Sequence, residues 1–82
     1  MKFTVYSKYG CPYCVKVLSL LNQVSVMKGI QVVEYVLGTH FTREEFYSEF
    51  GQGSTFPQVI CNETHIGGCS DTAKYLKEQN IV

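Results

Sequence analysis

The first 36 residues alternate between strand-like and helix-like spacing of hydrophobic side chains. Residues 3–6 are β-forming, and Lys8-Tyr9-Gly10 interrupt this run. Pro12 suits the first position of a helix, Lys28-Gly29 provide its end, and the apolar positions between them recur at helical spacing, at Val17, Leu18, Leu21 and Val24. Residues 31–36 are β-branched and mostly apolar on both faces, which predicts an interior strand parallel to the first. The pattern therefore predicts a βαβ unit with a right-handed crossover.

The next helix has the clearest start in the chain. Thr42 and Glu45 have the spacing of a capping box, and Phe41 is placed to pack against Phe46 across the first turn. We expect this helix to end near Phe50, because four loop-forming residues follow it: Gly51, Gln52, Gly53 and Ser54.

Two short strands and a last helix complete the pattern. Residues 58–61 and 64–66 are predicted strands around a turn at Asn62-Glu63, and the helix is predicted from about Asp71 to Glu78. Because 82 residues leave room for one hydrophobic core, the order β-α-β-α-β-β-α predicts a single α/β domain over residues 1–82.

Composition and charge narrow the classes of function. Hydrophobic residues make up 45% of the chain and charged residues 17%, which is typical of a globular protein. Seven Lys and Arg against seven Asp and Glu give a formal net charge of zero, so we expect no binding to nucleic acid or to a membrane surface. The N-terminus lacks the apolar region of a signal peptide, and no run approaches the roughly 20 apolar residues of a spanning helix. We therefore expect a cytoplasmic protein, most simply a monomer.

Four cysteines define the candidate chemistry. Two structural disulfides are not favoured without a secretion signal. The separation of Cys61 from Cys69 is too wide for the second knuckle of a zinc site, so no metal is expected. Cys61 lies in a predicted strand and should pack as a small apolar residue, whereas Cys69 lies in a glycine-rich bend where oxidation is an open alternative. The pair Cys11 and Cys14, between a predicted strand and a helix, is instead typical of a redox dithiol.

The two thiols of this pair are expected to differ. Cys11 is predicted just before the helix, where free backbone N–H groups and the helix dipole favour its thiolate. Cys14 lies inside the first turn, close enough to form a disulfide with Cys11 but less exposed. A lowered pKa gives little gain in attack rate, because nucleophilicity falls with it, but it makes the sulfur a better leaving group and stabilises the reduced form. The pair therefore suits thiol–disulfide exchange in both directions.

Three ordered motifs along the chain resemble those of a known protein family. Cys11-Pro12-Tyr13-Cys14 is similar to the active-site tetrapeptide of dithiol glutaredoxins. Thr55-Phe56-Pro57 is similar to their Thr-Val-Pro loop, and Gly67-Gly68-Cys69-Ser70-Asp71 to their Gly-Gly-x-Ser/Thr-Asp segment. The resemblance spans essentially the whole chain and implies a thioredoxin-like fold, with a four-stranded mixed sheet flanked by three helices. It also implies a glutathione-dependent oxidoreductase that reduces protein disulfides and glutathione mixed disulfides.

The resemblance also implies roles for individual residues. Cys11 would attack the substrate disulfide, Cys14 would resolve mixed disulfides with proteins, and glutathione would be the reductant, without a metal. The implied glutathione site includes a cis Pro57 and is formed by Lys8, Tyr13, Thr55, Phe56, Pro57, Gly68, Ser70 and Asp71. A simple N-cap role for Ser70 or Asp71 is compatible with that site.

The sequence departs from the family pattern in one loop and leaves one contact open. Phe56 replaces the commoner valine, which changes the bulk of the pocket but not the backbone pairing implied for this position. Three residues compete for the place opposite the glycyl carboxylate of glutathione: Arg43, Glu44 and Gln52.

Two other functions remain open at the level of sequence. One is a thioredoxin-like carrier reduced directly by a flavin reductase. The other is a module that binds an iron–sulfur cluster between two protomers through Cys11 and glutathione; Pro12 argues against it, because cluster-binding relatives usually carry a smaller residue there. The implied partners are glutathione and disulfide-containing or glutathionylated proteins. Ribonucleotide reductase is a usual client of the family, and no residue here selects it.

Overall fold

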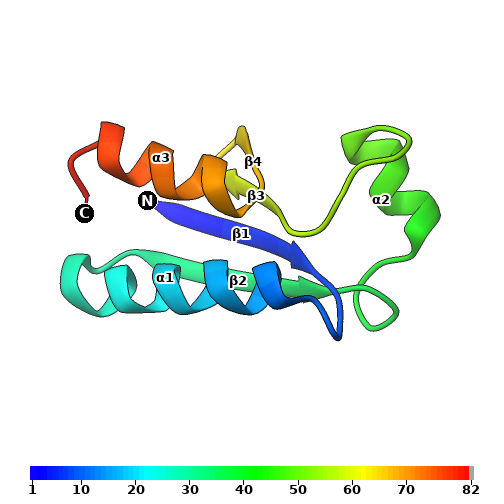
Figure 1. The fold of residues 1–82 in the computed structure, drawn as a ribbon, viewed down its shortest axis with the longest axis horizontal. Helices are drawn as coiled ribbons and strands as arrows, with labels where there is room; N and C mark the ends of the chain where they lie inside the picture. Colours follow the sequence, from blue (N-terminus) through cyan, green and yellow to red (C-terminus); the bar gives the residue numbers. More distant parts are fainter. Residues whose placement is uncertain (82) are drawn as a thin grey trace.

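All seven predicted elements form, in the predicted order, in the computed structural model, which describes residues 1–81 (Figure 1). The elements are β1 (Lys2–Ser7), α1 (Pro12–Lys28), β2 (Gln31–Val36), α2 (Arg43–Phe50), β3 (Gln58–Cys61), β4 (Thr64–Gly67) and α3 (Cys69–Glu78). The four strands lie in the order β2-β1-β3-β4. β2 is parallel to β1, while β3 is antiparallel to both β1 and β4, so the predicted mixed sheet is confirmed.

The prediction that residues 31–36 form an interior strand is wrong. β2 pairs only with β1 and forms one edge of the sheet, and Tyr35 is 37% exposed. The strand is apolar on both faces because each face has packing partners. α1 packs on one face, and on the other the Tyr35 ring lies 5.5 Å from the ring of Tyr6 on β1. The strands with neighbours on both edges are β1 and β3, and Phe3 and Val5 on β1 are fully buried.

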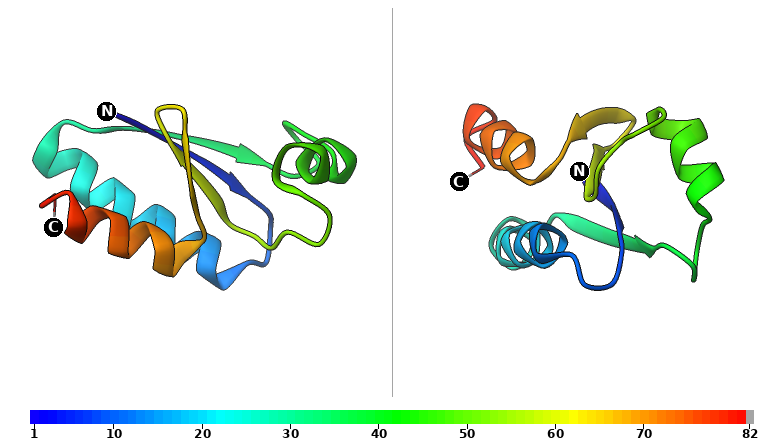
Figure 2. Two further views of the ribbon diagram at one scale, coloured as in Figure 1. Left: turned by 90° about the horizontal axis from the view of Figure 1, so that it is seen from above. Right: turned by 45° about the vertical axis from the view of Figure 1, so that its right-hand side comes forward.

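α1 and α3 pack side by side on one face of the sheet and enclose the core (Figure 2). The core contains nine residues: Phe3, Val5, Val17, Leu21, Val24, Ile30, Val59, Cys61 and Leu76. Cys61 is 2% exposed, so its predicted role as a small apolar core residue is confirmed. No helix within residues 1–81 is both long and apolar enough to span a membrane.

α2 lies on the opposite side of the sheet, at one end of it (Figure 2). It is attached there by what we call the aromatic cluster: Tyr6, Tyr35, Phe41, Phe46, Phe50 and Phe56. The predicted start of α2 is confirmed. The Thr42 hydroxyl accepts a hydrogen bond from the Glu45 N–H (3.1 Å), and the Glu45 carboxylate accepts one from the Thr42 N–H (2.9 Å). The rings of Phe41 and Phe46 stack across this turn, 5.8 Å apart.

We expect Thr42→Ala to lower the free energy of unfolding by about 1 kcal/mol, because it removes the side-chain acceptor of an N-cap. Urea unfolding followed by circular dichroism measures this change. Thr39→Ala is the matched control, since Thr39 is an exposed threonine in the preceding turn, and it should change the stability by less than about 0.5 kcal/mol. Equal losses in the two variants would show that the cap does not stabilise α2.

α3 begins earlier than predicted, at Cys69 instead of Asp71. Its N-cap is Gly68, so the suggestion that Ser70 or Asp71 is the N-cap is wrong. Asp71 is at the third helical position, and its carboxylate accepts a hydrogen bond from the Gly68 N–H (3.3 Å). Gly67 has φ +124°, and a Cβ there would lie 2.5 Å from the Asp71 carboxylate, so this approach requires glycine.

Candidate active site

Cys11 and Cys14 form a disulfide at the start of α1, with Cα atoms 5.2 Å apart. Cys11 is the N-cap, as predicted, and its Sγ accepts a hydrogen bond from the Cys14 N–H (3.2 Å). Cys14 is 2% exposed and Cys11 7%, so the predicted order of exposure holds. Once the disulfide is reduced, an N–H directed at the Cys11 sulfur favours its thiolate over its thiol.

The loop before β3 runs beside the start of α3. The Phe56-Pro57 peptide bond is cis, as the resemblance implied. A Cβ at Gly68 would lie 3.7 Å from the Pro57 carbonyl oxygen, so the two segments are in close contact. The structure thus brings together two motifs that are about ten residues apart in the sequence.

The side chain of Gln58 supports this loop. Its amide N–H donates to the Thr55 carbonyl (2.8 Å), and its amide oxygen lies 2.7 Å from Nε2 of His65 on β4. Gln58 is 8% exposed, whereas Thr55 and His65 are exposed, so the two hydrogen bonds satisfy the buried amide from the margin of the sheet. The loop is therefore fixed to the sheet through β4.

The loop accommodates Phe56, which is larger than the family's valine, because its ring packs within the aromatic cluster. Its ring stacks on that of Phe46, with centroids 4.1 Å apart and an interplanar angle of 10°. Lys8 Nζ lies 5.3 Å from the centre of the Phe56 ring. The extra bulk belongs to the aromatic cluster, and the lysine adds positive charge above its edge.

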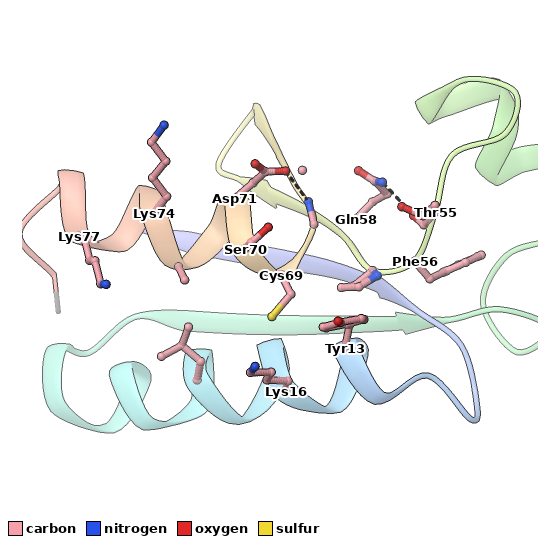
Figure 3. A pocket seen from close by; sticks show the side chains of 15 residues that line it. Tyr13, Lys16, Thr55, Phe56, Gln58, Cys69, Ser70, Asp71, Lys74 and Lys77 are labelled. Atoms are coloured by element: carbon pink, nitrogen blue, oxygen red, sulfur yellow. Dashed lines mark hydrogen bonds between the residues drawn. The ribbon is translucent and has the colours of Figure 1, made fainter.

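A pocket of about 890 Å³ lies between this loop, α1 and the start of α3 (Figure 3). Seven of the eight residues predicted to bind glutathione line it: Tyr13, Thr55, Phe56, Pro57, Gly68, Ser70 and Asp71. The eighth, Lys8, is outside the lining, and its Nζ lies over the ring of Phe56, which belongs to it. Cys11 and Cys14 are also outside the lining, although Tyr13, between them in sequence, belongs to it.

Several residues of the pocket were not predicted from the sequence. Arg43, Glu44 and Gln52, the three candidates for a further contact, are not part of its lining. The cations of the lining are three lysines instead, Lys16 on α1 and Lys74 and Lys77 on α3, and the remaining residues not predicted are Leu20, Gln58, Gly67, Cys69 and Ala73. The net charge of zero gives no indication of this group of lysines. What brings them together is the packing of α1 against α3.

Metal binding has no visible basis in the described part of the chain. Within residues 1–81, no three side chains of His, Cys, Asp or Glu gather into a possible metal site.

A family model, curated relatives and solved structures all match this chain to the same family. The family model described as Glutaredoxin matches residues 3–66. Glutaredoxin 1 of Rickettsia prowazekii is 34% identical over 77 residues, which are 94% of this chain and 79% of the relative. The structure of reduced Escherichia coli glutaredoxin superposes with a TM-score of 0.80 at 28% identity, covering 100% of both chains. A buckwheat glutaredoxin–glutathione complex gives 0.74 at 25% identity, covering 96% of this chain and 71% of the other. The thioredoxin-like fold is thereby confirmed.

Proposed function

The chain belongs to the glutaredoxin family of thiol–disulfide oxidoreductases, and from this premise we propose that it reduces protein disulfides and glutathione mixed disulfides with glutathione as its reductant. The observation that carries the proposal is the Cys11–Cys14 disulfide at the start of α1, next to a pocket lined by Tyr13. A disulfide at a helix start is suited to exchange, because the helix stabilises the sulfur that leaves when the bond is broken.

With a glutathionylated protein, the Cys11 thiolate attacks the glutathione sulfur. A new disulfide joins Cys11 to glutathione, the old bond breaks, and the protein sulfur leaves as a thiolate that takes up a proton. A second glutathione, as its thiolate, then attacks the mixed disulfide. Oxidised glutathione leaves, and the Cys11 thiolate is restored.

With a protein disulfide, Cys11 attacks first and Cys14 then resolves the mixed disulfide. The protein leaves with two thiols, and Cys11 and Cys14 become the disulfide of this structure. Two glutathione molecules reduce it and leave together as oxidised glutathione. The short distance between the two Cα atoms, 5.2 Å, supports the resolving role of Cys14.

Glutathione binds along the loop and the start of α3. Phe56 pairs its backbone with the cysteine of glutathione as an added strand, beside Thr55 and the cis Pro57. The γ-glutamyl carboxylate accepts hydrogen bonds from the backbone N–H groups of Ser70 and Asp71, beside Gly68 at the start of α3, where the helix dipole is positive. Tyr13 covers the sulfur of glutathione, and Lys8 lies near the glycyl carboxylate of glutathione. The bound glutathione of the buckwheat relative supports this use of the pocket.

The choice of reductant tests the proposal against a carrier reduced by a flavin enzyme. The oxidised protein is mixed with NADPH and either glutathione with glutathione reductase or thioredoxin reductase alone, and NADPH consumption is followed with a glutathione mixed disulfide as substrate. We expect turnover only with glutathione. Equal or faster reduction by thioredoxin reductase alone would overturn the proposal in favour of the carrier.

A further inference from the structure

The pocket continues beyond the residues to which we assign glutathione, along the groove between α1 and α3. We call this extension the lysine groove; it is lined by Lys16, Leu20, Ala73, Lys74 and Lys77. Figure 3 shows Lys77 on the side of α3 that faces α1 and Lys16 on the near side of α1, while Lys74 extends on the outer side of α3. Glutathione at the start of α3 leaves this part of the pocket free for another group.

The charge of the groove favours an anionic occupant. Three lysines line the whole pocket against a single carboxylate, that of Asp71, which already accepts a hydrogen bond from the Gly68 N–H. The acidic residues Glu45 and Glu49 line a separate cavity under α2, on the opposite side of the sheet. The chain is therefore neutral overall but has a basic side at the groove and an acidic side at α2. A basic cleft of this kind attracts carboxylates and raises their local concentration.

The dimensions of the groove fit a short stretch of polypeptide. Ala73 and Lys77 are four residues apart on α3, which corresponds to about 6 Å along the helix axis. An extended chain advances about 3.3 Å per residue, so this length accommodates about two residues. Leu20 and Ala73 add an apolar floor on which a backbone can lie, with Lys16 and Lys77 at its margins.

We propose that the lysine groove binds an acidic segment of the protein substrate, within about two residues of the cysteine whose disulfide is reduced. The inference rests on the proposed function, since the groove is continuous with the pocket to which we assign the glutathione half of the mixed disulfide. The cysteine of the substrate is joined to that glutathione, so its neighbouring residues must lie close by. Aspartate or glutamate side chains there meet the ammonium groups of Lys16 and Lys77.

Charge reversal in the groove tests this inference with two glutathionylated peptides that differ only in two residues beside the cysteine, Asp in one and Asn in the other. We expect the double variant K16E/K77E to lower kcat/KM for the Asp peptide about tenfold relative to the Asn peptide, because two surface attractions become repulsions. The difference should shrink as salt is added. Each rate is divided by that of the same variant with the mixed disulfide of glutathione and 2-mercaptoethanol, which has no flanking residues.

Lys2→Glu is the matched control. Lys2 is an exposed lysine on β1, and the alternation of side chains along the strand places it opposite Phe3, on the face away from the groove. We expect this control to leave the ratio of the two peptides unchanged. Urea unfolding of each variant accounts for any loss of stability, since Lys77 also lies in the last turn of α3.

Two results would overturn the inference alone: an equal loss for the Asp and Asn peptides in K16E/K77E, or the same change of ratio in Lys2→Glu. Failure of the unmodified protein to turn over the 2-mercaptoethanol disulfide would overturn the proposed function, and this inference with it. The small substrate therefore separates the two failures.

Discussion

Cys11→Ser is expected to abolish turnover of every disulfide substrate, by more than about a thousandfold, because loss of the nucleophile in a covalent mechanism costs up to about 10⁶-fold. The serine hydroxyl cannot ionise at neutral pH, so the backbone N–H that meets the Cys11 sulfur has no thiolate to stabilise. The measurement is NADPH oxidation coupled through glutathione and glutathione reductase, first with the small mixed disulfide and then with a protein disulfide.

Cys14→Ser provides the contrast, since it removes the neighbouring sulfur and keeps the nucleophile. Mixed disulfides of glutathione need only Cys11, so their turnover should stay within about a factor of ten of the unmodified protein, whereas reduction of protein disulfides by the dithiol route should be lost. The assignment of Cys11 as nucleophile is wrong if Cys14→Ser is the inactive variant and Cys11→Ser the active one. Residual activity in both would point to one of the free thiols, Cys61 or Cys69.

The elements that the sequence predicted well are those defined by residues close together in the chain. The start of α2 depends on Thr42, Glu45 and a phenylalanine pair, all within six residues, and each predicted contact forms. The end of α1 at Gly29 is equally local, since this glycine adopts φ +69° and its N–H donates to the Ser25 carbonyl.

The misplaced features depend on contacts between distant segments. Whether β2 is an edge or an interior strand is decided by the return of β3 to the other side of β1, about 25 residues later. α3 starts early because its N-cap, Gly68, has no side chain, and the cap contact comes from inside the helix instead: the Asp71 carboxylate accepts a hydrogen bond from the Gly68 N–H. A search for side-chain caps places such a helix too late.

The candidate site shows the same division. The motifs around Cys11, Pro57 and Asp71 could be read as short segments, and the structure gathers their residues around one pocket. The lysine groove could not be read in this way, because Lys16 and Lys77 lie 61 residues apart and approach only when α1 packs on α3. Charge summed over the sequence carries no information about that packing.

Phe46→Ala should cause the largest loss of stability in the molecule outside the core. Phe46 is 1% exposed, and its ring meets those of Phe41, Phe50 and Phe56, so it links α2 to the sheet and to the loop before β3. Truncation of a buried phenylalanine costs about 3–5 kcal/mol. A domain of this kind has a total stability of about 5–15 kcal/mol, so the loss is a large fraction of it. Equilibrium urea unfolding measures the change, and a loss below about 1 kcal/mol would show that α2 is attached by other contacts.

The same ring connects stability to glutathione binding, and Phe46→Leu separates the two. Leucine keeps most of the buried apolar volume, so this variant should lose less than about 1.5 kcal/mol and remain folded in the assay. It removes the nearer of two rings that stack on Phe56, whose backbone we assign to glutathione, and leaves the Phe41 ring at 6.2 Å, so the loop becomes freer to move. We therefore expect a rise of about threefold to tenfold in KM for glutathione, since an aromatic pair contributes about 0.5–1.5 kcal/mol, with little change in the rate at saturation. An unchanged KM in the folded Phe46→Leu protein would mean that the hydrogen bonds of Gln58 to Thr55 and His65, with the Phe41 ring, are sufficient to position the loop without Phe46.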